Sequence, residues 1–391
     1  MPENVLLTRD FNFASPNGGV CDALIIAGEH SGDEQAARML KKAFAKKGDL
    51  KVCAFGGEAL ASAGAQLLFD MTAFSVVGLM EVLKNYSFFK KLSEAIVDWI
   101  CLYRPRAVCF VDYPGLNLHI AQALKQRGIS CMGGGNVRTL YYISPQIWAW
   151  KAKRRFKMAE TLDSLAVIFP FETACYADTS LSVSFVGHPF LEDSYKPNVK
   201  LDEAGKILLL AGSRSIAVSR IFPVMLKALD MLPNQKAVAI YPTSEIKKIL
   251  ETCLKKNPKI ESRVQLIGNK HDVLGVKAVM MSSGTMSLAC SLQGIPGAIV
   301  YKANPLTYAI GRSLVKIKYL SIANILLDSP AWPEFIQFEA SAQKLAAYMQ
   351  KCVSDSGERK KFVQYAAKLK GLLRAPQEMD AAGWLIENIK K

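Results

Sequence analysis

The sequence predicts an α/β protein made of two Rossmann-like, doubly wound domains that face each other across a cleft. Short, β-branched apolar runs alternate with longer amphipathic stretches from about residue 22 onward, a pattern typical of parallel strands covered by helices on both faces. The series of runs is interrupted once, near Gly187-His188-Pro189, and then starts again. With 391 residues the chain is long enough for two domains of ordinary size.

The expected strands fall into two series. The first is expected at residues 23–27, 52–55, 107–111, 140–143, 164–168 and 184–186. The second is expected at residues 207–210, 237–240, 264–267, 278–281 and 298–301. Helices are expected between the strands, for example over residues 33–46 and 93–103, where apolar residues recur with helical spacing.

The two strand series divide the chain into four expected parts. Residues 1–20 form an N-terminal extension, 21–188 the first Rossmann-like domain, 189–365 the second, and 366–391 a C-terminal helical tail that could pack back on the first domain. The charged segment 192–206 is expected to link the domains. Two such domains would place the carboxyl ends of two parallel sheets beside a cleft, where ligands usually bind.

The charge balance indicates an anionic partner. The chain has 49 Lys and Arg against 34 Asp and Glu, a formal net charge of +15, which suits nucleic acid, a phosphorylated substrate or a membrane surface. Nucleic acid is the weakest of the three, because the basic residues are dispersed and no RNA or DNA motif accompanies them.

Cysteine and histidine spacing argues against a metal site. The nine cysteines include no CxxC pair, and the four histidines lack ligand-like spacing. We therefore expect no metal, no cofactor and no disulfide framework, and a reducing cytoplasm. The N-terminus has no apolar core of signal-peptide length, and polar residues interrupt the longest uncharged stretch, 278–301. A soluble or peripheral protein is expected.

Two motifs in the first domain could carry chemistry. The sequence GEHSGD (28–33) follows the first expected strand and opens a helix, so its glycines and free N–H groups could receive a ligand. Alternatively it is only a turn, capped by Ser31 or Asp33. Asp112 follows the strand 107–111, and a carboxylate at the carboxyl end of a parallel strand is a candidate general base. The alternative is that Asp112 caps the following turn.

Two motifs in the second domain indicate an anion site. The sequence LLLAGSR (208–214) combines a small turn, a hydroxyl and the cation of Arg214, which can pair with two phosphate oxygens. The sequence SSGT (282–285) offers a second set of N–H and hydroxyl donors at a helix start. Each could be simple helix capping, but two on one sheet favour a phosphate or diphosphate site.

An apolar segment with adjacent lysines lies at residues 70–92. It holds more large apolar side chains than one loop and one short helix bury easily, and Lys90 and Lys91 follow them. An apolar surface beside cations is typical of a protein that lies on an anionic bilayer. The side chains expected at the membrane are Phe74, Val76, Val77, Leu79, Met80, Phe88 and Phe89.

These motifs occur together with others in a specific order. The others are FGGEALASAG (55–64), SVVGLMEVLK (75–84), DYPGLN (112–117), YYISPQIWAWKAKR (141–154), FPFE (169–172), FVGHP (185–189), YKANPLTYAIGRSLVK (301–316) and SIAN (321–324). From about residue 23 to residue 375 the sequence resembles the lipid-A-disaccharide synthases, inverting glycosyltransferases whose two Rossmann-like domains form the GT-B arrangement.

The resemblance implies a reaction and a set of site residues. A UDP-linked diacylglucosamine would donate its sugar to diacylglucosamine 1-phosphate, forming a β-1,6 disaccharide phosphate and UDP without a metal, in lipopolysaccharide biosynthesis. Asp112 would be the general base. The UDP part of the donor would contact Gly212, Ser213, Arg214, Ser283, Gly284, Thr285 and Asn324 in the second domain. The acceptor side, in the first domain, would comprise Glu29, Ser31, Gly32, Glu81 and His188.

The resemblance also implies a location, and the sequence departs from the family in places. The cytoplasmic face of the inner membrane is the expected location, with its anionic surface as a partner. A homodimer is possible, and the sequence does not decide the oligomeric state. Ala217 and Ala289 replace glutamates usual in the family, and residues 1–20 and 129–138 are not typical of it. A non-catalytic lipid- or nucleotide-binding homologue therefore stays an alternative, as does another UDP-sugar transferase or epimerase on the same frame.

Overall fold

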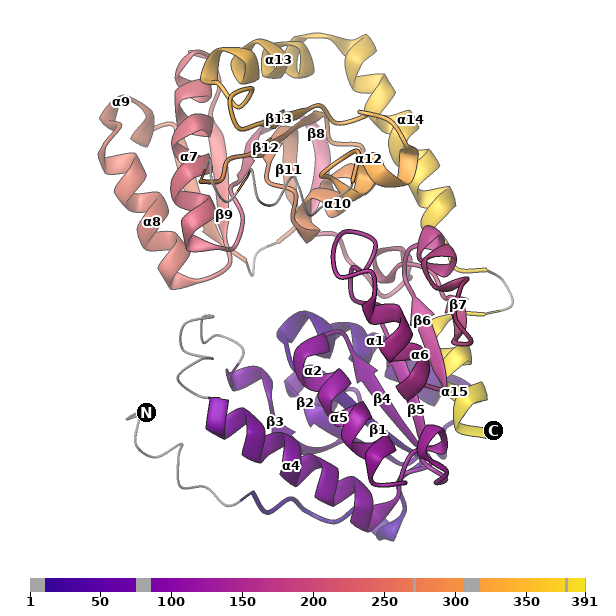
Figure 1. Ribbon diagram of the computed structural model, residues 1–391. Coiled ribbons are helices and arrows are strands. Elements are labelled where there is room, and N and C mark those ends of the chain that lie inside the picture. The colour runs from indigo at the N-terminus through magenta and orange to yellow at the C-terminus, as the bar shows by residue number, and fades with distance from the viewer. Residues whose placement is uncertain are drawn as a thin grey trace. The chain divides into compact units, whose positions relative to one another are not determined.

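The computed structural model consists of two compact α/β units (Figure 1). The first unit comprises residues 1–189 and 375–391, and the second comprises residues 190–374. Within them, the residues that the structure describes are 11–74, 86–269, 272–304, 308, 317–376 and 379–390. Each unit is built on one parallel β-sheet with helices packed on it, which confirms the predicted class of two Rossmann-like domains.

The first unit contains a seven-stranded sheet in the order β3-β2-β1-β4-β5-β6-β7, and every neighbouring pair is parallel. Its strands are β1 (Ala23–Ala27), β2 (Val52–Gly56), β3 (Gln66–Asp70), β4 (Ala107–Val111), β5 (Arg138–Tyr142), β6 (Ser164–Val167) and β7 (Ser182–Phe185). All residues of β1, β2 and β4 are buried. Their sequences are continuous apolar runs because both faces of these strands are covered.

Helices of the first unit come from both ends of the chain. They are α1 (His30–Lys46), α2 (Glu58–Ser62), α4 (Tyr86–Tyr103), α5 (Pro114–Gln126), α6 (Arg154–Thr161) and α15 (Ala381–Lys390). Short 3-10 turns are η2 (Asn17–Gly19), η3 (Thr72–Phe74), η4 (Cys131–Gly133), η5 (Pro170–Tyr176) and η6 (Pro189–Leu191), the last at the boundary between the units. α15 packs against α1, β5 and β6, and the Trp384 indole N–H donates to Ser164 Oγ at 2.9 Å.

The segment before β1 belongs to the core of the first unit. The ring of Phe13 contacts Phe55 with 4.7 Å between centroids, and Phe11 contacts Phe88 with 5.4 Å between centroids. Phe88 is only 6% exposed. The structure therefore corrects the placement of Phe88 on a membrane-facing surface, because this side chain fills the core beneath the N-terminal segment.

The second unit contains a six-stranded sheet in the order β10-β9-β8-β11-β12-β13, again with parallel neighbours. Its strands are β8 (Val199–Leu210), β9 (Ala237–Tyr241), β10 (Val264–Gly268), β11 (Leu274–Met281), β12 (Gly297–Tyr301) and β13 (Glu334–Ile336). Its described helices are α7 (Ser215–Asp230), α8 (Ser244–Lys255), α9 (Pro258–Glu261), α10 (Thr285–Leu292), α12 (Ile322–Leu327), α13 (Ala342–Ser354) and α14 (Ser356–Leu373).

β8 begins earlier than the sequence predicts. The predicted linker spans residues 192–206, whereas β8 starts at Val199 and pairs with β11 from that residue. The register then jumps, because Gly275 of β11 pairs with Lys200 while the next residue of β11 pairs with Lys206. The structure corrects the second half of the linker prediction: residues 199–206 belong to a bulged strand.

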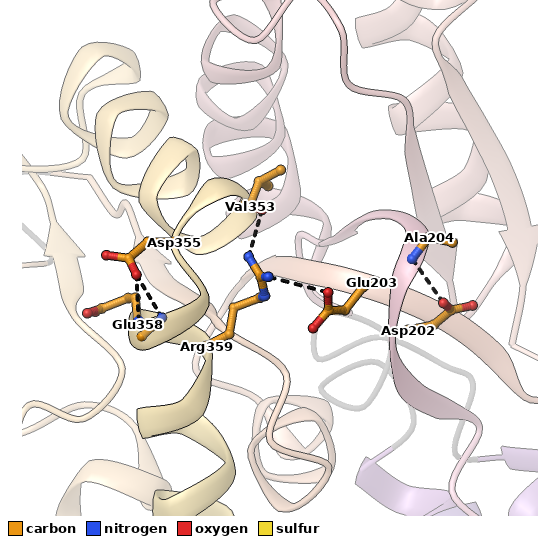
Figure 2. A network of polar contacts seen from close by, with 8 residues as sticks. Asp202, Glu203, Ala204, Val353, Asp355, Glu358 and Arg359 are labelled. Atoms are coloured by element: carbon orange, nitrogen blue, oxygen red, sulfur yellow. Dashed lines mark hydrogen bonds and ion pairs between the residues drawn. The ribbon is translucent and has the colours of Figure 1, made fainter.

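The bulge of β8 is tied to the start of α14 (Figure 2). The Arg359 guanidinium donates to the Glu203 carboxylate at 3.3 Å and to the Val353 carbonyl at 2.9 Å. Asp355 caps α14 by accepting the backbone N–H of Glu358 at 3.1 Å. These contacts join the first strand of the second unit to its last helix.

Candidate functional site

The strand order of each sheet reverses at one point, between β1 and β4 in the first unit and between β8 and β11 in the second. Ligands of doubly wound sheets bind beyond the carboxyl ends of the strands at this reversal. GEHSGD follows β1, Asp112 follows β4, GSR follows β8 and SSGT follows β11. Most of the predicted site residues therefore lie at the strand reversal of their own unit.

Asp112 lies in a turn with an unusual backbone. Asp112 and Tyr113 have φ values of 45° and 47°, in the left-handed region that residues other than glycine rarely adopt. The Tyr141 hydroxyl donates to the Asp112 carbonyl oxygen at 2.5 Å, and the Asn117 amide donates to the same oxygen at 2.7 Å. The Asp112 N–H donates to the Tyr142 carbonyl at 3.0 Å. Strained turns that are held in this way cluster at functional sites.

The loop after β1 approaches this turn because of Gly28. A Cβ atom at Gly28 would lie 2.4 Å from the ring of Tyr113, so a side chain at this position would force the two loops apart. Glu29 and Ser31 are exposed at the start of α1, and Gly32 is buried. The structure therefore brings the GEHSGD loop and the Asp112 turn together, as their adjacent parallel strands require.

Asp33 has a role other than the predicted one. The sequence offers it as a cap of its own helix, whereas its carboxylate accepts the backbone N–H of Gly57 at 2.7 Å and of Ala59 at 3.0 Å. A Cβ atom at Gly57 would lie 2.7 Å from this carboxylate. The structure corrects the prediction: Asp33 caps α2, and its buried carboxylate holds the start of that helix.

The Asp112 carboxyl has a raised pKa. Burial raises the pKa from 3.8 to about 6, and the negative charge of Glu29 adds to the rise, whereas a hydrogen bond from the Tyr113 backbone lowers it. At neutral pH the carboxyl is ionised, yet its pKa is close enough to neutrality for it to take up a proton. This property suits a general base, since hydrogen bonds to a simple capping carboxylate would favour a low pKa.

A second buried carboxyl near Asp112 is one that sequence reasoning misses. Glu172, in η5, is 1% exposed and accepts the Phe169 N–H at 3.1 Å. Burial raises the pKa of Glu172 to about 8 against the opposing effect of its hydrogen bonds, and the charge of Asp112 contributes to the rise. The only signal in the sequence is an acid directly after Phe-Pro-Phe.

His188 is buried within the first unit. Its ring packs against Phe169 with 5.3 Å between centroids. Burial, together with the positive charge of Arg38, lowers the pKa of His188 to about 3. The imidazole is therefore neutral over the physiological range.

The loops after β8 and β11 lie beside each other in the second unit. The Ser282 N–H donates to the Leu210 carbonyl at 2.8 Å, and a Cβ atom at Gly212, whose φ is 112°, would lie 3.1 Å from Ser282 Oγ. α7 begins at Ser215 and α10 at Thr285. Two helix N-termini, each with free N–H groups and a positive dipole end, therefore meet at this edge of the sheet.

The side chains at these two helix starts are accessible to a ligand. Ser213, Arg214, Gly284 and Thr285 are exposed, and Ser283 is partly buried. Neither helix has an acidic residue in its first turn. The Ser215 hydroxyl at the start of α7 donates to the Glu245 carboxylate, so one acid lies beside this helix start. The exposed hydroxyls, the backbone donors and the Arg214 guanidinium nevertheless suit a diphosphate.

Asn324 does not join this group. It is fully buried, and its amide donates to the Trp332 carbonyl at 2.7 Å and to the Glu334 carboxylate at 2.9 Å. Its side-chain oxygen accepts the Trp332 N–H at 2.9 Å. The structure corrects the expected nucleotide contact, because both amide hydrogens of Asn324 are used to hold α12 to the segment that leads into β13.

Most of the residues that are predicted to face the membrane lie outside the residues that the structure describes. Val76, Val77, Leu79, Met80 and Glu81 lie outside the described residues, and Phe74 ends η3. Phe89 is partly buried and packs against the core of the first unit. Of the described helices, none is both long and apolar enough to cross a bilayer.

The described residues do not form a cluster of metal ligands. Within residues 11–74, 86–269, 272–304, 317–376 and 379–390, no group of three or more His, Cys, Asp or Glu side chains could hold a metal ion. Each unit thus has its own candidate residues at its strand reversal: the Asp112 turn in the first unit, and the starts of α7 and α10 in the second.

Comparison with known sequences identifies close relatives. A family model described as "Lipid-A-disaccharide synthetase" matches residues 23–385. Lipid-A-disaccharide synthase 1 of Legionella pneumophila (strain Philadelphia 1) is 32% identical over 369 residues, covering 90% of this chain and 94% of the relative. Lipid-A-disaccharide synthase of Geobacter sulfurreducens is 31% identical over 385 residues, covering 94% of both chains.

Comparison with solved structures supports the fold. A glycosyltransferase from Rickettsia africae superimposes with a TM-score of 0.53 at 12% identity, covering 94% of this chain and 96% of the other. A UDP-GlcNAc 2-epimerase from Neisseria meningitidis bound to UDP-GlcNAc gives a TM-score of 0.57 at 12% identity, covering 94% and 99%. At these identities the likeness shows the two-domain GT-B architecture alone.

Proposed function

The chain belongs to the lipid-A-disaccharide synthase family and is a glycosyltransferase of lipid A biosynthesis, and from this membership we propose its substrates and site. The donor is a UDP-linked diacylglucosamine and the acceptor is diacylglucosamine 1-phosphate. The products are the β-1,6-linked disaccharide 1-phosphate and UDP. The observation that carries the assignment of roles is the strained turn of Asp112 at the strand reversal of the first unit.

Asp112 acts as the general base in this proposal. The 6-hydroxyl oxygen of the acceptor attacks the anomeric carbon of the donor, and the bond from that carbon to the diphosphate oxygen breaks. The proton of the hydroxyl passes to the Asp112 carboxylate, and UDP leaves with the bonding electron pair. A carboxyl whose pKa is raised to about 6 is ionised before the attack and basic enough to take the proton.

The donor diphosphate is assigned to the second unit. Arg214 and the hydroxyl of Ser213 lie at the start of α7, and Gly284 and Thr285 lie at the start of α10. The backbone N–H groups of the two helix starts are held in place by the fold. Together with the Arg214 cation, they would stabilise the negative charge that develops on the leaving diphosphate.

A turnover assay with both diacylated substrates tests this function. Purified protein is incubated with radiolabelled donor and unlabelled acceptor, and the expected result is a labelled disaccharide phosphate whose formation depends on the acceptor. Acceptor-independent conversion of the donor to an epimer would instead favour a UDP-sugar epimerase. Binding of both substrates without any product would favour a non-catalytic homologue.

We expect kcat/KM to fall on the acid side with a midpoint at about pH 6. The base must be ionised, and burial together with Glu29 raises the pKa of Asp112 to about 6. Glu29→Gln removes the like charge and should move the midpoint to lower pH. The midpoint should stay above the ordinary aspartate range, because burial remains. The pH dependence of initial rates in both proteins provides the measurement.

Glu58→Gln is the matched control for that shift. Glu58 is exposed on α2 in the same unit, and its carboxylate hydrogen-bonds Ser62 at 3.2 Å. The control makes the same change in net charge and should leave the midpoint in place. An equal shift in both variants, or none in Glu29→Gln, would show that Glu29 does not act on the base.

We also propose that the protein works peripherally on the cytoplasmic face of the inner membrane. The net charge is +15, and in the sequence the apolar residues Val76, Val77, Leu79 and Met80 precede the exposed Lys90 and Lys91. The protein should sediment with anionic vesicles and be released by salt plus detergent. Each cation contributes about 1 kcal/mol, which salt screens, while the apolar part persists. Complete release by salt alone would remove the apolar contribution from the proposal.

A further inference from the structure

The loop between β5 and α6 carries cations gathered around one exposed indole. Trp150 is 52% exposed. Lys151 Nζ lies 4.5 Å from the centroid of its ring, and the guanidinium carbon of Arg154 lies 5.8 Å from it. Lys153, between them in sequence, is also exposed. Two positive side chains therefore lie beside one indole, and a third is exposed on the same loop.

These cations differ from the neighbouring arginine in lacking an acidic partner. Arg155 makes two hydrogen bonds with the Asp178 carboxylate, at 2.7 and 2.6 Å. In the described parts of the chain, no ion pair joins a carboxylate to Lys151, Lys153 or Arg154. Like charges held close together repel each other unless an anion lies between them. Arg155 is paired with a carboxylate of the protein, whereas Lys151, Lys153 and Arg154 are available to a ligand.

The backbone of this loop is also strained. Lys151 has a φ of 54°, in the left-handed region that a side chain with a Cβ rarely adopts. The strained conformation holds Lys151 over the face of Trp150. Outliers of this kind persist where the surrounding structure holds them, and they cluster at ligand-binding positions.

The cluster lies at the same edge of the sheet as Asp112. β5 is paired in parallel with β4, so the residues that follow the two strands emerge side by side. Tyr141 of β5 hydrogen-bonds the Asp112 carbonyl. Burial raises the pKa of the Tyr141 phenol, and the positive charge of Arg154 opposes that rise.

We propose that Lys151 and Arg154, which lie beside Trp150, bind the phosphate monoester of the acceptor together with the exposed Lys153 between them in sequence. This inference rests on the proposed function and assigns the recognition of one substrate group within it. A phosphate monoester carries close to two negative charges at neutral pH, which two or three unpaired cations match, and an arginine can contact two of its oxygens. The exposed indole face offers an apolar surface for the attached sugar ring.

The double variant Lys151→Gln/Arg154→Gln tests the assignment. We expect the KM for the acceptor to rise by at least about 10–100-fold, because a single charge-assisted hydrogen bond is already worth about one to two decades of affinity. The KM for the donor should stay within about two-fold, since UDP is assigned to residues of the second unit and the cluster belongs to the first. Calorimetric titration of the acceptor alone should show the same loss, so that the readout does not depend on turnover.

Lys157→Gln is the matched control. Lys157 is exposed on α6, one turn beyond Arg154, and its replacement removes a positive charge from the same helix without touching the indole cluster. It should leave the acceptor KM within about two-fold of the native value. An equal loss in the control would mean that general electrostatic attraction, rather than a defined phosphate site, sets acceptor affinity.

An acceptor that lacks its phosphate identifies the group recognised. The native protein should bind this analogue about 10–100-fold more weakly than the phosphorylated acceptor, and the double variant should bind the two almost equally. Equal discrimination by both proteins would overturn the proposal. If the variant keeps acceptor affinity in detergent but loses binding to anionic vesicles, the phosphate recognised is a lipid headgroup and the assignment is wrong.

Failure of this inference and failure of the proposed function are distinguishable. If native protein makes no disaccharide, the proposed function fails, whatever the variants do. If native protein makes disaccharide and the double variant binds acceptor normally, only the phosphate assignment fails. The replaced side chains are at the surface, so an unchanged melting temperature is expected in both variants; if the double variant melts early, the single variant Lys151→Gln carries the same comparison.

Discussion

Replacing Asp112 by asparagine is expected to abolish disaccharide synthesis in a protein that stays folded. A positioned general base contributes about 10²–10⁴-fold to the rate, and asparagine has nearly the same shape but cannot accept the proton. The hydrogen bonds from Tyr141 and Asn117 go to the backbone carbonyl of Asp112, so the substitution leaves the turn in place. Initial rates with both diacylated substrates provide the measurement.

Stability separates this expectation from a structural effect. The folded-state pKa of Asp112 is raised from 3.8 to about 6. A raised carboxyl pKa stabilises the fold at low pH, and this contribution is lost as pH rises through about 6. At neutral pH the ionised carboxylate is therefore unfavourable for folding. Asp112→Asn should melt at the native temperature or above it, as followed by circular dichroism.

Asp163→Asn is the matched control for the rate. Asp163 accepts the backbone N–H of Thr139 at 2.7 Å, at the amino end of the same sheet, so the control makes the same chemical change far from the carboxyl edge. It should keep native turnover. Near-native turnover in folded Asp112→Asn would mean that Asp112 only caps its turn, and the base would then have to be sought elsewhere at this edge.

The central strands are predictable from the sequence because a strand that is buried on both faces consists of consecutive apolar residues. β1 and β4 occupy the predicted residues, since every position in them is buried and apolar. β3 and β13 are not among the predicted strands. β3 is only partly buried along its length, and β13 has three residues. Neither therefore produces a continuous apolar run.

Site residues are predictable where the strand order of the sheet determines their position. The residues after β1, β4, β8 and β11 reach the strand reversals because parallel pairing puts them there. Contacts between side chains of different segments cannot be predicted from the pattern of residues along one segment. Asp33 caps α2, a helix other than its own. Asn324 hydrogen-bonds the backbone of Trp332, and the ring of Phe11 packs on Phe88.

Arg214→Ala is expected to weaken UDP binding about 10–100-fold. A hydrogen bond to a charged group contributes about 1.5–3 kcal/mol, which corresponds to one to two decades of affinity. Arg214 is exposed at the start of α7, beside the glycine turn that lets the loops after β8 and β11 approach. Isothermal titration calorimetry with UDP measures the loss.

Two controls decide whether that loss belongs to the diphosphate. Arg220→Ala makes the same change farther along α7, away from the helix start, and should bind UDP normally. Asp112→Asn should also bind UDP normally, because Asp112 belongs to the other unit. If instead Arg214→Ala binds UDP with native affinity, the diphosphate does not sit at the α7 N-terminus. The SSGT edge at the start of α10 would then be the remaining candidate in the second unit, with Thr285→Ala as the variant that tests it.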